Sequence, residues 1–193
     1  AFLHIDDILE AHQTETPSGK PVPIERMLTD GQSVMVRVIK DPLGTKGARL
    51  STQISIAGRL LVYLPQEKHI GISQRIQDEK ERELLKTRVQ QFLSEDEKGG
   101  FIIRTMAEDA SDQDLETDAV VLKKLLRSLK DKAYTTAAPA LLYQDLTLSE
   151  RILRDFVHEN TSKILVDSHD EFAKLQEFAR IYTPDILDRI SCY

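Results

Sequence analysis

An arginine and a threonine directly follow an apolar run, at a position where turn residues are expected. The run is residues 101–103 of the segment GGFIIRTMAEDA, and Arg104 and Thr105 come next. A guanidinium can bind a phosphate through two parallel N–H donors, and a neighbouring hydroxyl adds a further hydrogen bond. The alternative interpretation pairs Arg104 with a nearby acid such as Glu108. The first interpretation predicts a phosphate-binding group at the end of a buried strand.

Two glycine-containing segments offer further positions for an anion. Gly58 lacks a side chain and would let a phosphate approach backbone N–H groups closely. The loop DPLGTKGA, residues 41–48, carries Lys46 between two glycines. This loop lacks the spacing of a nucleotide-binding phosphate loop, and a strand rather than a helix follows it. We therefore interpret it as a hairpin that presents Lys46 to a nucleic-acid backbone.

The charge pattern favours a local phosphate-binding face over a generally basic surface. The net charge is -6, which argues against a protein coated with basic residues for nucleic acid. Residues 37–59 nevertheless hold five basic residues against one acid, Asp41. The acids gather elsewhere, in residues 78–83, 94–98 and 107–118. Localised phosphate binding fits this division, and a solvated strand face is the alternative.

Residues for other kinds of chemistry are poorly placed. The single cysteine, Cys192, excludes a disulfide framework within the chain and favours a reducing, cytoplasmic setting. The five histidines fall at no metal-ligand spacing. The aspartates of the C-terminal segment show no evident two-metal arrangement, and Asp167 is more simply interpreted as a helix cap. The sequence therefore predicts neither a zinc site nor a hydrolytic centre.

The ends and the hydropathy of the chain suggest a piece of a longer protein. No apolar run approaches the roughly 18 residues that a membrane-spanning helix needs. The N-terminal residues AFLHIDDILEAHQ contain no starting Met and no basic segment before an apolar one, so they do not resemble a signal peptide. We expect a fragment without a transmembrane segment.

The elements that must position these side chains follow from the hydrophobic periodicity. Alternating or continuous apolar runs predict strands, and apolar residues at three- and four-residue spacing predict helices. Ser111 with Asp114 predicts a capping box, and Ser168 predicts an N-cap. Strands are expected over 1–5, 33–40, 49–56, 57–65, 101–105, 139–145 and 163–168. Helices are expected over 77–98, 111–134, 148–157 and 168–182.

Several segments together resemble the bacterial ribonuclease E/G family. They are, in chain order, VIKDPLGTKGARLSTQISIAGRLLVYLP, GISQRI, GGFIIRTMAE, LRDF and ILVDS. The resemblance covers nearly the whole chain and implies an α+β fold. It implies the C-terminal part of an OB-type RNA-binding barrel over residues 1–49, a mixed α/β 5′-sensor domain over 50–147, and a ribonuclease-H-like segment over 148–193.

The resemblance also assigns roles to residues of the sensor. The family's Arg-Thr pair that binds a 5′-monophosphate matches Arg104 and Thr105. The glycine and the valine whose backbone lines the same pocket match Gly58 and Val62. A further arginine of the sensor matches Arg75. These residues together are expected to bind the 5′-phosphate of RNA.

In the barrel, the resemblance assigns two residues to the RNA chain. An aromatic residue that stacks on or supports the substrate matches Phe2, and a lysine that contacts the backbone matches Lys46. Aromatic stacking on unpaired bases is how such barrels hold single-stranded RNA.

The resemblance implies a parent protein that is a Mg²⁺-dependent, single-strand-specific endoribonuclease of RNA processing and decay. Its partner would be single-stranded RNA with a 5′-monophosphate, not DNA, and the parent enzyme would form a homo-oligomer. The family's two catalytic aspartates and its paired zinc-link cysteines have no match in this sequence. We therefore expect no catalytic residue, no bound metal and no RNA cleavage by this chain alone. A non-catalytic OB-type RNA-binding module is the alternative.

Overall fold

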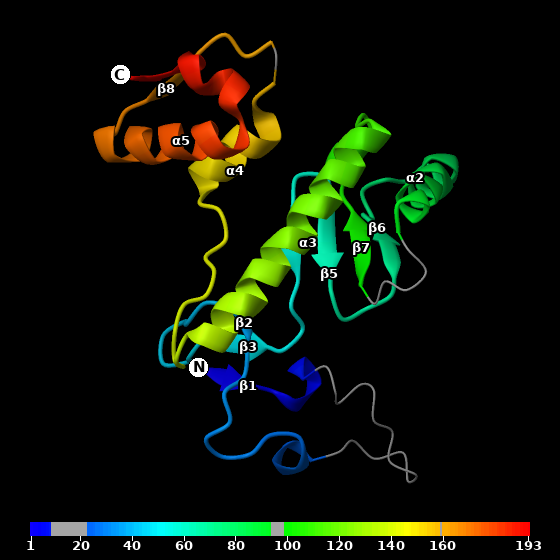
Figure 1. The fold of residues 1–193 in the computed structure, drawn as a ribbon, viewed down its shortest axis with the longest axis vertical. Helices are drawn as coiled ribbons and strands as arrows, with labels where there is room; N and C mark the ends of the chain where they lie inside the picture. Colours follow the sequence, from blue (N-terminus) through cyan, green and yellow to red (C-terminus); the bar gives the residue numbers. More distant parts are fainter. Residues whose placement is uncertain (9–22, 94–98, 159) are drawn as a thin grey trace. The chain divides into compact units, whose positions relative to one another are not determined.

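The computed structural model describes residues 1–8, 23–93, 99–158 and 160–193. These residues form two compact units, 1–142 and 143–193 (Figure 1). Both units combine helices with strands, which confirms a mixed α/β protein. The boundaries expected after residues 49 and 147 stay predictions, as do the OB-type and ribonuclease-H-like classifications.

The first sheet contains the N-terminus and the hairpin around Lys46. Its strands are β1 (Phe2–Leu3), β2 (Arg37–Lys40) and β3 (Arg49–Ser51). β3 lies in the centre, parallel to β1 and antiparallel to β2. The β2–β3 pair confirms the predicted hairpin, although both strands are shorter than expected. Over the described residues this sheet is open rather than closed into a barrel.

An ion pair attaches the 3₁₀ helix η1 (Ile5–Asp7) to β3. The Asp7 carboxylate accepts hydrogen bonds from Arg49 Nε at 2.7 Å and Nη2 at 3.0 Å. The Asp7 carbonyl oxygen accepts from Thr52 N and from Ser51 Oγ, both at 2.9 Å. Arg49 belongs to the predicted basic face, but its guanidinium is bound here to a buried carboxylate. The first turn of the chain is therefore held by polar contacts.

We expect the Asp7–Arg49 pair to stabilise the first unit at neutral pH and not in acid. The hydrogen bond from Arg49 holds the pKa of Asp7 below its usual value. A carboxyl with a lowered folded pKa adds stability above its unfolded pKa of about 3.9, and this is lost as pH falls through the folded pKa. Urea unfolding of wild type and Asp7→Asn should show a wild-type advantage near neutral pH that vanishes well below pH ~4. A difference that does not vary with pH would contradict this.

The second sheet is the framework of the candidate site. Its strands are β4 (Ile56–Ala57), β5 (Leu61–Leu64), β6 (Ile70–Ile72) and β7 (Gly100–Ile103). They are ordered β4-β5-β7-β6; β5 is antiparallel to β4 and β7, and β6 is parallel to β7. The strand predicted over 57–65 begins only at Leu61, because residues 58–60 form the turn between β4 and β5.

One face of the second sheet is covered by two helices, α2 (Glu79–Gln91) and α3 (Asp112–Thr135). Figure 1 shows α3 alongside β5 and α2 beside β6. Alternate residues of the central strands point into this core, and the rings of Tyr63 and Phe101 stack with centroids 4.9 Å apart. The capping box of Ser111 and Asp114 at the start of α3 is confirmed. α2 ends at Gln91, earlier than predicted, and residues 94–98 lie outside the described residues.

Short 3₁₀ helices complete the first unit: η2 (Ile24–Arg26) and η3 (Thr105–Ala107). The second unit contains α4 (Leu148–Phe156), β8 (Ile164–Val166), α5 (His169–Tyr182), η4 (Pro184–Arg189) and β9 (Ile190–Cys192), with β8 and β9 parallel. The N-cap Ser168 is confirmed.

The strand predicted over 139–145 is wrong: the Leu142 carbonyl accepts a hydrogen bond from Lys132 Nζ at 2.8 Å instead of pairing in a sheet. Among the described helices, none has the length and apolarity needed to cross a membrane.

Candidate phosphate-binding site

The topology of the second sheet brings three segments together at one end. Because β6 and β7 are parallel, both finish at this end, and antiparallel β5 starts there. The backbone continues the pairing beyond the strands: Ser73 N donates to Ile103 O at 2.8 Å, and Arg104 N donates to Leu60 O at 2.9 Å. We call this region the arginine end; it comprises residues 57–61, 73–76 and 104–105. Each segment contributes one arginine: Arg59, Arg75 and Arg104.

Arg104 is half-buried and lies between β7 and η3, the strand-end position that the sequence indicated. Its Nη1 donates to the backbone carbonyl oxygens of Gly58 and Arg59, the latter at 3.1 Å. A guanidinium has five N–H donors in a rigid planar fork, and Nη1 supplies two of them. The contacts of Nη1 therefore fix the plane of the fork against the β4–β5 turn.

Thr105 is the first residue of η3 and is half-buried beside Arg104 in the chain. The turn that follows is closed by two backbone hydrogen bonds, from Ala107 N to Arg104 O at 3.0 Å and from Glu108 N to Thr105 O at 3.2 Å. The Arg-Thr pair thus occupies a backbone segment with defined hydrogen bonds at the arginine end.

The β4–β5 turn is held from the other side by a carboxylate of α3. Asp118 Oδ1 accepts a hydrogen bond from Arg59 N at 3.3 Å, and Oδ2 accepts from Leu60 N and Leu61 N, both at 2.9 Å. A Cβ placed on Gly58 would lie 2.5 Å from Oδ2. The space that glycine leaves is therefore filled by a carboxylate of the protein. A direct role of Gly58 toward a phosphate stays a prediction.

Asp118 was not among the residues singled out from the sequence. The available signal was its position in α3, because residues three and four apart share one face of a helix. Leu115 and Leu122 are buried and flank Asp118 at these spacings. An acid on the apolar face of a helix needs hydrogen-bond partners, and that requirement pointed to a specific contact.

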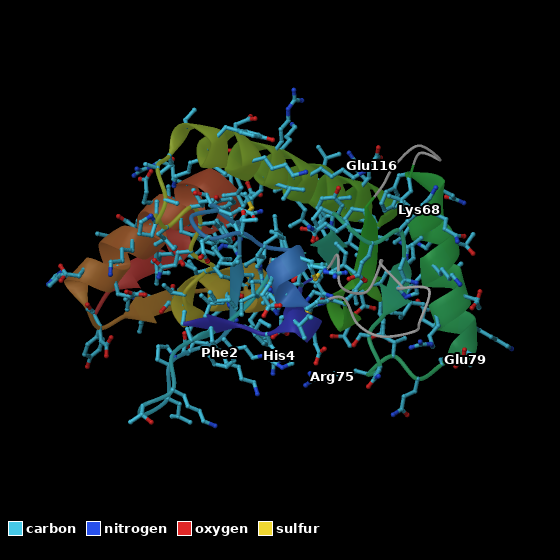
Figure 2. All side chains as sticks on the ribbon, turned by 90° about the horizontal axis from the view of Figure 1, so that it is seen from below. Phe2, His4, Lys68, Arg75, Glu79 and Glu116 are labelled. Carbon is cyan, nitrogen blue, oxygen red and sulfur yellow. The ribbon has the colours of Figure 1, made fainter. Side chains whose placement is uncertain are left out.

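Val62 and Arg75, the other two residues expected in the phosphate pocket, differ in their exposure to solvent. Val62 is a half-buried residue of the central strand, paired with Ala57 on one side and Ile102 on the other. Arg75 is exposed on the loop that precedes α2, and Figure 2 shows its side chain extending away from the ribbon. Arg82 supports this loop, because its Nη1 donates to Ser73 O at 3.1 Å and to Ile76 O at 2.9 Å.

Phe2 and Lys46, the residues expected to contact the RNA chain, both belong to the first sheet. Phe2 lies on β1 with 47% of its surface exposed (Figure 2). Lys46 is exposed and closes a two-residue turn, exchanging backbone hydrogen bonds of 3.0 Å with Leu43. Phe2 N donates to Ala48 O at 2.8 Å, which links β1 to the strand that follows the turn. Gly44 at φ 57° provides the left-handed residue that such a turn requires.

In the part of the chain that the structure describes, no three His, Cys, Asp or Glu side chains are grouped so that they could hold a metal ion. The Mg²⁺ that the family resemblance implies for the parent enzyme stays a prediction. We assign no metal-dependent step to this chain.

The described residues form a mixed α/β protein that carries Arg59, Arg75, Arg104 and Thr105 at one end of its second sheet. The sequence model of the ribonuclease E/G family matches residues 55–193. Ribonuclease G of Haemophilus influenzae is 41% identical over 197 aligned positions, and ribonuclease G of Escherichia coli is 40% identical over 199. Each alignment covers all of this chain and 40% of the relative. Ribonuclease E of a Nostoc species is 32% identical over 177 positions, covering 92% of this chain and 25% of that protein.

The chain belongs to the ribonuclease E/G family, which confirms the resemblance found in the sequence. It spans only 40% of the length of these ribonuclease G relatives.

Proposed function

We propose that this chain is the RNA-binding and 5′-monophosphate-sensing part of a single-strand-specific endoribonuclease that acts in RNA processing and decay. The observation that carries the proposal is the placement of Arg104, Thr105 and Arg75 at one end of the second sheet. The names of the relatives, ribonuclease G and ribonuclease E, support the class of reaction.

The chemistry of the arginine end suits a terminal phosphate. A 5′-monophosphate carries between one and two negative charges near neutral pH, whereas a 5′-hydroxyl carries none. Hydrogen bonds between a guanidinium and a phosphate are charge-assisted and about twice as strong as neutral ones. The contacts of Arg104 with Gly58 and Arg59 orient the guanidinium in advance, so that less side-chain entropy is lost when a ligand binds. A triphosphate is bulkier and would fit this site poorly.

The first sheet would hold the RNA chain itself. The exposed Phe2 offers a surface on which an unpaired base can stack, a contact worth about 1–3 kcal/mol per base. The exposed Lys46 can contact the phosphate backbone. Residues of the longer protein would supply Mg²⁺ and the cleavage step. A bound 5′-phosphate would favour the cleavage-competent state by differential binding, which is a coupling between two sites.

The test compares RNAs that differ only in the 5′ group. The longer protein that contains this chain is incubated with AU-rich single-stranded oligonucleotides ending in a monophosphate, a hydroxyl or a triphosphate. We expect the monophosphate RNA to have the highest kcat/KM, by about tenfold or more, from one to two charge-assisted hydrogen bonds. Equal values for monophosphate and hydroxyl RNA would refute the sensing role.

Two controls accompany this assay. This chain alone, with Mg²⁺ and the monophosphate RNA, should give no specific product, and a specific product would contradict the assignment of catalysis to other residues. Cleavage by the longer protein distinguishes the proposal from a non-catalytic RNA-binding module, which would bind all three RNAs and cut none.

A further inference from the structure

Two peptide units of the β4–β5 turn lie between a carboxylate and a guanidinium. In the Gly58–Arg59 peptide, the N–H donates to Asp118 Oδ1 and the carbonyl oxygen accepts from Arg104 Nη1. In the Arg59–Leu60 peptide, the N–H donates to Asp118 Oδ2 and the carbonyl oxygen accepts from the same Nη1. Each peptide therefore binds an anion with its N–H and a cation with its C=O.

This arrangement follows from the geometry of a trans peptide, in which the N–H and C=O groups point in opposite directions. Successive N–H groups that converge on one point form a common anion-binding arrangement in proteins. Here the N–H groups of Arg59, Leu60 and Leu61 converge on the Asp118 side chain. A negative charge at one end of a chain of hydrogen bonds polarises each peptide and strengthens the bonds at the other end.

We propose that Asp118 is a positioning residue for Arg104 and thereby for recognition of the 5′-phosphate. This inference rests on the function proposed above. Asp118 does not contact the phosphate; it fixes the two carbonyl groups that hold Nη1, and these set the direction of the remaining N–H donors of the fork. Without the carboxylate the turn loses three hydrogen bonds, and the guanidinium loses its fixed support.

The absence of a side chain at Gly58 leaves the space that the Asp118 carboxylate occupies. The φ of Gly58 does not lie in the left-handed region, so an alanine could adopt the same backbone conformation. The obstacle is the Asp118 carboxylate, whose two oxygens would lie 2.5 Å and 2.7 Å from an added Cβ. Glycine is therefore required at this position by the carboxylate, and the two residues should act as one unit.

The experiment uses the longer protein and measures the ratio of kcat/KM for the 5′-monophosphate RNA to that for the 5′-hydroxyl RNA. Asp118→Asn keeps the size of the side chain but places an NH₂ group against backbone N–H donors. We expect the ratio to fall about tenfold, from the loss of about one charge-assisted hydrogen bond at the ligand. The fall should come mainly from a higher KM for the monophosphate RNA. Hydrogen exchange of the 57–62 backbone amides should become faster.

A double-mutant cycle tests the link between Gly58 and Asp118. Gly58→Ala should lower the ratio in the wild-type background, because the Cβ displaces the carboxylate. In the Asp118→Ala background the space is open, and Gly58→Ala should lower the ratio no further. Such non-additivity is expected for residues in direct contact.

Asp112→Asn is the matched control. Asp112 is also an acid of α3, but its carboxylate is bound by Arg88 Nε at 2.5 Å. This variant removes one charge from the same helix and should leave the ratio unchanged.

Three results would overturn the inference. The first is an equal fall for both RNAs in Asp118→Asn together with a lower melting temperature, which would indicate a purely structural role. The second is an unchanged ratio and unchanged exchange at 57–62 while Arg104→Ala still abolishes the preference; the proposed function would then stand without Asp118. The third is a fully additive cycle. If Arg104→Ala leaves the ratio unchanged, the proposed function itself fails.

Discussion

Arg104→Ala is expected to lower the preference for 5′-monophosphate over 5′-hydroxyl RNA by about 10- to 100-fold. The substitution removes hydrogen bonds between a cation and an anion, each worth about 1.5–3 kcal/mol, and 1.4 kcal/mol is about a tenfold change. Cleavage of 5′-hydroxyl RNA should fall far less, because that RNA presents no terminal phosphate to the guanidinium. The measurement is kcat/KM of the longer protein on two oligonucleotides of identical sequence.

Two further variants test whether this effect comes from the guanidinium of Arg104 in particular. Arg104→Lys keeps the positive charge but lacks the planar fork, so it cannot hold two turn carbonyls and orient donors at a phosphate together. We expect an intermediate preference for it. Arg127→Ala removes an exposed arginine of α3 and should leave the preference unchanged. An equal loss on both RNAs in Arg104→Ala would argue for a structural role of Arg104 and against sensing.

Phe101→Ala is expected to destabilise the first unit by about 3–5 kcal/mol, the usual cost of removing a large buried aromatic side chain. Phe101 is fully buried in β7, and its ring stacks on Tyr63 with centroids 4.9 Å apart. Lys123 Nζ lies 5.6 Å from the ring centroid and would lose this contact as well. The affected strands, β5 and β7, are two of the strands that carry the arginine end.

The loss of stability is best measured by a method that reports on the first unit separately from the second. Hydrogen exchange of the β5 and β7 amides reports the stability of the first unit directly. The control is Phe156→Ala: Phe156 is 71% exposed on α4, and a surface substitution of this kind costs less than about 0.5 kcal/mol. A loss below about 1 kcal/mol for Phe101→Ala would contradict the packing described here, because buried aromatic truncations cost several times more.

Elements whose signal is local could be predicted from the sequence. The capping box of Ser111 and Asp114 and the N-cap Ser168 depend on residues within three positions of each other, and both are present. The position of Arg104 directly after a buried strand is likewise local information. The strand expected over 139–145 was wrong, since an apolar run forms a strand only where a neighbouring strand can accept its hydrogen bonds.

The sequence by itself determined the family, the helices and most strands, and an Arg-Thr pair at a strand end, because periodicity, caps and ordered motifs are properties of short segments. Only the tertiary structure decided that Gly58 makes room for a carboxylate and that Asp118 binds the turn that holds Arg104. These partners are far apart in the chain, 58 positions in the case of Asp118 and Leu60. Contacts at such separations depend on how α3 packs against β5, and no local pattern specifies which atoms then meet.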